Sequence, residues 1–101
     1  MIAVLFEAMA VADKKDRYFQ LAEQLKPLLI TVDGFVSIER FQSTTDPNKF
    51  ISLSWWSDEK AIKVWKENVH HMLAQNEGKK SIFSWYKINV LTSTREYRSQ
   101  S

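Results

Sequence analysis

Cysteine is absent from this chain of 101 residues, and glycine and proline occur only twice each. Without cysteine the chain has no disulfide, no thiolate metal ligand and no cysteine nucleophile. Disulfides persist mainly in oxidising compartments, so their absence is consistent with the cytoplasm, where we expect this protein. The scarcity of glycine and proline indicates few sharp turns and long regular elements.

An excess of charge of one sign is also missing, as is any long apolar run. The 14 basic and 12 acidic residues give a net charge of +2, and the basic pairs Lys14–Lys15 and Lys79–Lys80 stand alone. A nucleic-acid interface needs clustered basic residues, so we expect no nucleic-acid partner. No window approaches the ~20 apolar residues of a membrane span. Glu7 interrupts the apolar start, which also lacks the basic segment of a signal peptide. We therefore expect no membrane association.

What the chain does have is 45% hydrophobic and 13% aromatic residues. This composition is typical of a folded globular protein rather than a disordered one. The length suits a single domain with one modest core. We therefore expect one domain over residues 1–101, in which residues 95–101 form a polar C-terminal tail.

Two helices and a third helical region are expected from the spacing of apolar residues. The first covers residues 13–30 with Asp13 as its N-cap, and the second runs from the N-cap Ser57 to about Asn68. The region 70–83 is expected to be helical but broken near its glycine. Four strands are expected where apolar residues alternate or cluster between turn residues, at residues 2–11, 35–42, 49–56 and 85–94.

The resulting order predicts an α+β, ferredoxin-like βαββαβ domain with a four-stranded antiparallel sheet and both helices on one face. The sheet has more apolar surface than one helical layer can cover, from Ala3, Leu5, Val36, Ile38, Ile51, Leu53, Trp55 and Leu91. A bare apolar sheet face usually marks an interface. We therefore predict a homodimer in which two sheets pack face to face.

Neighbouring residues on a strand point to opposite faces of its sheet. Trp55 and Trp56 are therefore expected to divide, one facing the helices and the other facing the partner. Glu39 and Arg40 are expected to divide in the same way. For this second pair we predict a cross-strand or intersubunit salt bridge.

The segment from Trp65 to Tyr86 mixes polar groups with large aromatic side chains. It reads W-x5-H-x2-A-Q-x2-G-x4-F-x2-Y and includes His71, Gln75 and Phe83. Such a mixture suits the wall of an apolar pocket better than a plain core helix. A lone histidine is most often structural or exposed. Near Trp65 and Tyr86 in a pocket, however, His71 could act as a base, a donor or a metal ligand.

Glu7 is a carboxylate within a mostly apolar strand. It is expected at the sheet edge or the mouth of a cavity, or else in a pocket, where a raised pKa would let it act as a base. No metal site is visible, because His70 and His71 are adjacent rather than spaced i, i+4. The candidate sites include no nucleophile elbow, P-loop or dinucleotide fingerprint, so nucleotide-dependent chemistry and acyl transfer are not expected.

Together these motifs resemble the antibiotic biosynthesis monooxygenase (ABM) domain family. The similarity rests on Trp65 to Tyr86, on Gly34 through Glu39, on Asp46-Pro47, on Ser52 to Trp56 and on Arg95-x-Tyr97. This resemblance implies a dimeric α+β barrel of two ferredoxin-like units, with a pocket between the helices and the sheet of each subunit. Members of the family include cofactor-independent oxygenases of electron-rich aromatic or quinol-type molecules. A related branch binds and degrades haem.

The haem-degrading branch uses an Asn on the first strand, a Trp on the second long helix and an axial His ten residues after that Trp. Trp65 matches this pattern, but Gln75 occupies the axial position and Glu7 the first-strand position. Glutamine is a poor haem ligand compared with histidine. The resemblance therefore disfavours haem, and we expect no cofactor.

The leading hypothesis is a cofactor-independent monooxygenase acting on a small aromatic or quinol-type molecule in an apolar pocket. His71 or Glu7 would remove a proton, and the electron-rich anion would reduce O₂ directly. Four side chains would bind the substrate: Trp65, Gln75, Phe83 and Tyr86. The alternatives are a haem-binding or haem-degrading monooxygenase and a non-catalytic small-ligand-binding dimer.

Overall fold

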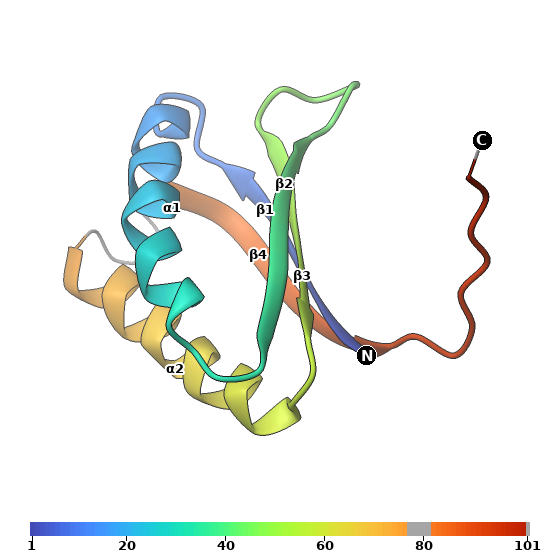
Figure 1. Cartoon of the computed structure of the whole chain (residues 1–101). Helices are drawn as coiled ribbons and strands as arrows, with labels where there is room; N and C mark the ends of the chain where they lie inside the picture. The colour runs from blue at the N-terminus through green and yellow to red at the C-terminus, as the bar shows by residue number, and fades with distance from the viewer. Residues whose placement is uncertain (77–81, 101) are drawn as a thin grey trace.

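The computed structural model describes residues 1–76 and 82–100, with side chains described for residues 1–68 and 82–100. Its elements follow the predicted order: β1 (Ile2–Ala10), α1 (Lys15–Ile30), β2 (Phe35–Gln42), β3 (Lys49–Trp56), α2 (Glu59–Asn76) and β4 (Phe83–Thr92). Both helices lie on one side of the sheet, and the chain after β4 extends away from the domain (Figure 1). The predicted ferredoxin-like α+β fold is confirmed.

The strands form one antiparallel sheet in the order β2-β3-β1-β4. β1 and β3 are central, with Leu5 opposite Leu53, and β4 lies on the other side of β1, with Leu5 opposite Asn89. Side chains alternate between the two faces along each strand. This register therefore decides which residues meet the helices and which stay on the face that no helix covers, here called the open face.

The ends of the helices differ from the prediction. α1 begins at Lys15, and its N-cap residue is Lys14, which makes no side-chain capping bond, so the assignment of Asp13 as N-cap is wrong. At α2 the carboxylate of Asp58 accepts a hydrogen bond from the Lys60 N–H at 2.8 Å. Asp58 therefore caps this helix in place of Ser57. α2 also continues past Asn68 to Asn76. The break expected near Gly78 lies outside the described residues.

Gly34 allows the turn between α1 and β2 to approach the start of α2. Its φ of +95° lies in the left-handed region that glycine adopts without steric cost. The Gly34 carbonyl accepts hydrogen bonds from the Ser57 N–H at 2.8 Å and from the Ser57 hydroxyl at 3.3 Å. A Cβ at this position would lie 3.1 Å from the Asp58 Cβ and 3.3 Å from the Ala61 Cβ.

A bulge at the start of β2 reverses the expected alternation there. The pairing with β3 shifts between Phe35 and Ser37, so one extra residue enters β2. Phe35 packs on the helix side against Trp56, with ring centroids 5.4 Å apart. Beyond the bulge, Ile38 also faces the helices, where it lines a cavity. Its predicted place on the open face is therefore wrong.

Two buried clusters fill the space between the sheet and the helices. One contains Ala8, Ala10, Tyr18, Leu21, Phe50, Ile82 and Phe83. The other contains Leu29, Trp56, Ala61 and Ile62. Trp56 is 0% exposed, whereas Trp55 lies on the open face opposite Ala3 of β1. The expected division of the two tryptophans between the faces is confirmed, and the contact of Trp55 with a partner stays a prediction. Within the described residues, no helix is long and apolar enough to cross a membrane.

Candidate active site

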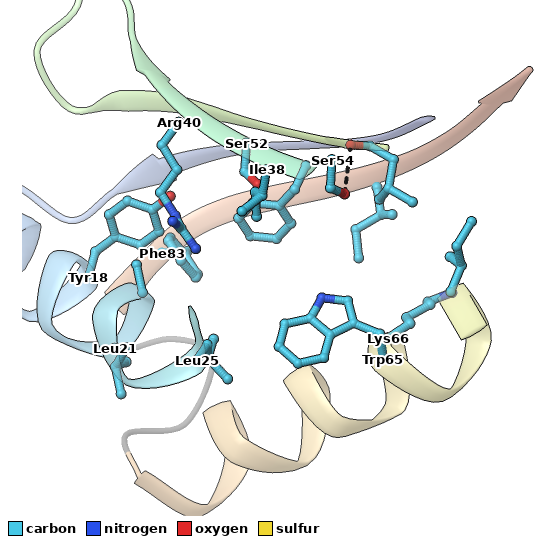
Figure 2. Close-up of a pocket in the computed structure, with 15 residues that line it drawn as sticks. Tyr18, Leu21, Leu25, Ile38, Arg40, Ser52, Ser54, Trp65, Lys66 and Phe83 are labelled. Atoms are coloured by element: carbon cyan, nitrogen blue, oxygen red, sulfur yellow. Dashed lines mark hydrogen bonds between the residues drawn. The ribbon is translucent and has the colours of Figure 1, made fainter. Parts of the chain in front are cut away.

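A cavity of about 100 Å³ lies between the helices and the sheet. Figure 2 shows residues of the sheet on one side of it and residues of both helices on the other. Most of its lining is apolar or aromatic: Val4, Phe6, Leu21, Ala22, Leu25, Ile38, Ile62, Trp65, Phe83 and Ile88. Its polar lining residues are Tyr18, Arg40, Ser52, Ser54 and Lys66. A concave, mostly apolar space with a few polar groups is the usual form of a small-molecule site.

The periodicity of each element explains how these residues meet. On β1 the even-numbered residues Val4 and Phe6 face the cavity, because strand side chains alternate with a period of two. On α1 the lining residues include Tyr18, Leu21 and Leu25, which are spaced three and four apart along one helical face. The same apolar stripe that packs the helix onto the sheet thus builds the cavity wall.

Aromatic rings form much of the cavity wall. Phe83 of β4 meets Tyr18 at a centroid distance of 5.5 Å and Phe6 at 5.7 Å, both edge to face. Trp65 projects from α2 toward the sheet, on the side of the cavity opposite Arg40 (Figure 2). Edge-to-face packing of this kind fixes the rings and presents a rigid apolar surface to a ligand.

Arg40 and Tyr18 place two hydrogen-bond donors at this apolar wall. Arg40 reaches from β2 to the Tyr18 hydroxyl (Figure 2). Burial raises the pKa of Tyr18, and the charge and hydrogen bond of Arg40 oppose part of that rise. The phenol therefore stays protonated at neutral pH. The predicted cross-strand salt bridge is not formed by Arg40, because no acidic side chain of the described residues pairs with it. The intersubunit form stays a prediction.

Two serines of β3 also face the cavity. Ser54 accepts a hydrogen bond from the Trp56 indole N–H at 2.9 Å, and its hydroxyl lies 3.5 Å from the Val4 carbonyl, to which it donates. Its hydrogen bonds thus serve the packing of β3. Ser52 lies directly across from Arg40 in the β2–β3 register and is largely buried. Sequence reasoning missed Arg40 and both serines, although alternation along the strands assigns each of them to one face.

The structure brings two of the predicted substrate-binding residues to the cavity, Trp65 and Phe83. Tyr86 packs behind the wall, with ring centroids 5.6 Å from Phe6 and 6.0 Å from Phe83, and is not among the lining residues. His71 and Gln75 belong to α2, where they follow Trp65 by six and ten residues. Their side chains fall outside the described part of the chain, so their predicted roles stay predictions.

Glu7 does not lie at this cavity. It occupies the open face of β1, where its carboxylate pairs with Lys87 at 3.1 Å and Lys49 at 3.3 Å. The hydrogen bond from Lys87 is the largest influence, and together with Lys49 it lowers the pKa of Glu7 below 4.5 despite the opposing effect of desolvation. The expectation of a pocket carboxylate with a raised pKa is therefore wrong. The reason is that neighbouring side chains of a strand point to opposite faces of the sheet, so Glu7 faces away from the cavity residue Phe6.

Metal ligands are not gathered anywhere in residues 1–68 and 82–100. No group of three or more histidine, cysteine, aspartate and glutamate side chains there could hold an ion. The chemistry assembled at the cavity is instead that of an apolar binding site with an arginine, a neutral phenol and an indole.

Comparison with known proteins gives a close family match. Residues 1–77 match the family model of the antibiotic biosynthesis monooxygenases. Jasmonate monooxygenase ABM from Pyricularia oryzae is 34% identical over 99 residues, which cover 98% of this chain and 46% of that protein. The chain thus spans about half the length of this relative. The uncharacterized protein YqjZ from Bacillus subtilis is 23% identical over 94 residues, covering 93% of this chain and 80% of that protein.

Solved structures share the fold at low sequence identity. A variant of SnoaB, a cofactor-independent oxygenase from Streptomyces nogalater, has a TM-score of 0.77 and 10% identity over 97% of both chains. Rv0793 from Mycobacterium tuberculosis has a TM-score of 0.78 and 14% identity, covering 96% of this chain and 98% of that one. The matched family model extends from β1 through the end of α2. This chain belongs to the antibiotic biosynthesis monooxygenase family.

Proposed function

We propose that this protein is a cofactor-independent monooxygenase that oxidises a small aromatic or quinol-type molecule in the cavity between its helices and its sheet. The observation that carries the proposal is the cavity itself, in which Trp65 and Phe83 contribute aromatic walls and Arg40 and Tyr18 contribute polar groups. Family membership and the resemblance in fold to a cofactor-independent oxygenase support the same reading.

The chemistry can balance without an external reductant. When O₂ converts an acidic CH₂ group of an electron-rich ring system into a carbonyl, one oxygen atom enters the carbonyl. The other leaves as water with the two hydrogens. The substrate supplies all four electrons, so no flavin, metal or haem has to deliver any. What the protein must supply is a base to form the substrate anion and an apolar space that excludes water.

The roles follow from position. The apolar walls Trp65 and Phe83 hold the ring system and keep water out. Arg40 and the neutral Tyr18 donate hydrogen bonds to the oxygen on which negative charge accumulates, as preorganised donors do in other anionic reactions. His71 is the proposed base, because an imidazole titrates near neutral pH and its backbone lies on α2, six residues after Trp65.

Oxygen uptake tests this proposal. Protein treated with a chelator is supplied with a panel of anthrone-type and quinol compounds in an oxygen electrode. The expected result is saturable uptake of one O₂ per substrate, with one oxygen atom recovered in the product by ¹⁸O₂ labelling. His71→Ala should lower turnover by about 10²- to 10⁴-fold, whereas its neighbour His70→Ala serves as the matched control. Turnover that survives His71→Ala would remove that residue from the role of base.

We also propose that two chains pair through the open face of the sheet. Several hydrophobic side chains of this face are substantially exposed in the single chain, among them Phe41, Trp85 and Leu91. Trp55, Leu53 and Ile51 continue the apolar surface along β3. A second copy of the same face would cover it, since an isologous interface pairs a patch with itself.

A further inference from the structure

Arg40 introduces a positive charge at the wall of a cavity that is otherwise mostly apolar. Its side chain leaves β2 on the helix side, and Figure 2 shows the guanidinium beside Tyr18. In residues 1–68 and 82–100, the acidic groups that form ion pairs are Glu7, with two lysines, and Glu96, with Arg98. The charge of Arg40 therefore has no counter-ion within the described part of the chain.

A charge withdrawn from bulk water is normally paired, because desolvation is costly. Here the group beside Arg40 is the neutral hydroxyl of Tyr18, which interacts with it. Tyrosine oxygen accepts from a guanidinium and still has its own hydrogen to donate. Arg40 has five N–H donors in a planar fork, so several remain for a ligand. Two adjacent groups thus offer donors at one place on the cavity wall, and neither carries a negative charge.

We propose that the cavity selects an apolar molecule carrying one oxyanion, and that Arg40 is the specificity-determining residue that binds this oxyanion, with Tyr18 as a second donor. The proposal rests on the proposed function in one respect, that this cavity is the substrate site. A planar carboxylate matches the guanidinium fork with two parallel hydrogen bonds, and a phenolate or enolate oxygen offers a single acceptor for the same group. The remainder of the ligand contacts Trp65 and Phe83.

Position on the sheet supports this assignment over a structural role for Arg40. The residue directly across from it is Ser52, which offers no charge. Lys66, the other cation at the cavity, is exposed on α2 and therefore well hydrated. Arg40 is half-buried and lies beside the buried Tyr18, where an ionic hydrogen bond is less screened by water.

The test uses pairs of probes that differ only in charge. Jasmonic acid and its methyl ester form the carboxylate pair, and 2-hydroxy-1,4-naphthoquinone and its methyl ether form the phenolate-type pair. Calorimetric titration of the wild-type protein is expected to give about ten- to hundredfold tighter binding of the charged member in at least one pair. The pair that shows the preference identifies the source of the oxyanion. Equal or weaker binding of the charged member in both pairs, including no binding, would overturn the proposal.

Variants then assign the preference to Arg40. Arg40→Gln should reduce the preference to about onefold while the neutral member binds as before, and Arg40→Lys should retain part of it, because lysine keeps the charge but loses the fork. Arg98→Gln, which removes an arginine from the exposed tail, is the matched control. A full preference in Arg40→Gln would overturn the assignment. Circular dichroism checks folding, and Arg40→Lys decides the question if Arg40→Gln is unfolded.

Oxygen uptake separates this proposal from the function on which it rests. Charge-selective binding that depends on Arg40, without O₂ consumption by any probe or panel compound, would leave the oxyanion site standing and contradict the oxygenase. Oxygen consumption that is equally efficient for charged and neutral members, and insensitive to Arg40→Gln, would support the oxygenase and overturn the oxyanion site.

Discussion

The two faces of the sheet treat charge in opposite ways. On the open face Glu7 is held between Lys87 and Lys49, and the Lys49 ammonium also lies 5.8 Å from the centre of the Trp85 ring. On the helix face Arg40 lies among aromatic and apolar residues without an acidic partner in the described part of the chain. The same sheet thus presents a carboxylate paired with lysines of its own chain on one face and an arginine without an acidic partner in the described residues on the other.

This contrast separates structural from functional charge. A charged group that is paired within its own chain is less costly to enclose in an interface than a charge left without a partner. A charged group at a cavity without such a partner is poised for one that arrives from outside. The open face therefore suits a second sheet, whereas the helix face suits a small anion. The four predictions below test this division, beginning with the largest expected effect.

The buried side of the sheet should dominate the stability of the fold. Trp56 is fully buried and donates to Ser54, so Trp56→Ala should lower the free energy of unfolding by about 3–5 kcal/mol through lost burial and a cavity. Trp55→Ala, its neighbour on the open face, should cost clearly less. The free energy of unfolding of each variant is measured by urea unfolding in chains that also carry Leu53→Lys, so that dissociation of subunits does not contribute. Equal losses in the two variants would contradict the division of the faces.

The open face should lose its partner when a charge is placed at its centre. Leu53 lies opposite Leu5 on one side and Glu39 on the other. Leu53→Lys can pair with Glu39 in the single chain, but it would bury an ammonium between two sheets. We expect the dimer to weaken by about 2 kcal/mol or more, measured by sedimentation equilibrium.

The control for this prediction is Val64→Lys, which introduces the same charge on the exposed surface of α2. It should leave the association unchanged. A wild-type chain that sediments as a monomer at micromolar concentration, or a Leu53→Lys variant that associates as tightly as the wild type, would remove the open face as the interface.

On the cavity side, the second donor should contribute less than the arginine. Tyr18→Phe keeps the ring that packs on Phe50 and Phe83 and removes only the hydroxyl beside Arg40. Affinity for the charged probe should fall by about 1 kcal/mol, while affinity for its neutral counterpart stays constant. Tyr97→Phe in the exposed tail is the matched control. A parallel loss for both probes would mean that the hydroxyl supports the cavity wall rather than the anion.

Much of this architecture follows from local patterns. The strands at residues 35–42 and 49–56 were predicted with the bounds that the structure has, because turn residues flank both of them and their side chains suit strands. The facing of Ile38 was not predictable from alternation alone, since the bulge between Phe35 and Ser37 depends on pairing with β3. Each helix start was misplaced by one residue, because Asp13 and Ser57 are both of a residue type that favours the N-cap, whereas the structure has Lys14 and Asp58 there.

The candidate site was harder to predict than the fold. Trp65 and Phe83 were chosen for their type and spacing, and both reach the cavity. Arg40 was overlooked because a charged residue in the middle of a strand ordinarily pairs across the sheet, and only the three-dimensional arrangement reveals that its neighbours are apolar. Glu7 was misplaced although strand alternation already separated it from Phe6.

The smallest effect is expected from the cluster of Glu7, Lys49 and Lys87 on the open face. Lys87 and Lys49 lower the pKa of Glu7 in the folded chain below its ordinary value of 4.5. The carboxylate therefore adds stability that is fully present above about pH 4.5 and is lost as the pH falls through the lowered pKa. Glu7→Gln should be less stable than the wild type at about pH 7 and equal to it in strong acid, at about pH 2.

Urea unfolding at these two pH values measures the difference, with sedimentation run alongside to check that the state of association is unchanged. Glu23→Gln, on the exposed surface of α1, removes one carboxylate elsewhere and should keep the wild-type loss of stability in acid, because Glu7 is intact. A difference between Glu7→Gln and the wild type that grows as the pH falls would reverse the sign of the linkage. It would mean that Glu7 is held neutral rather than ionised. Lys87 and Lys49 would then lack an ionised partner, as Arg40 does at the cavity.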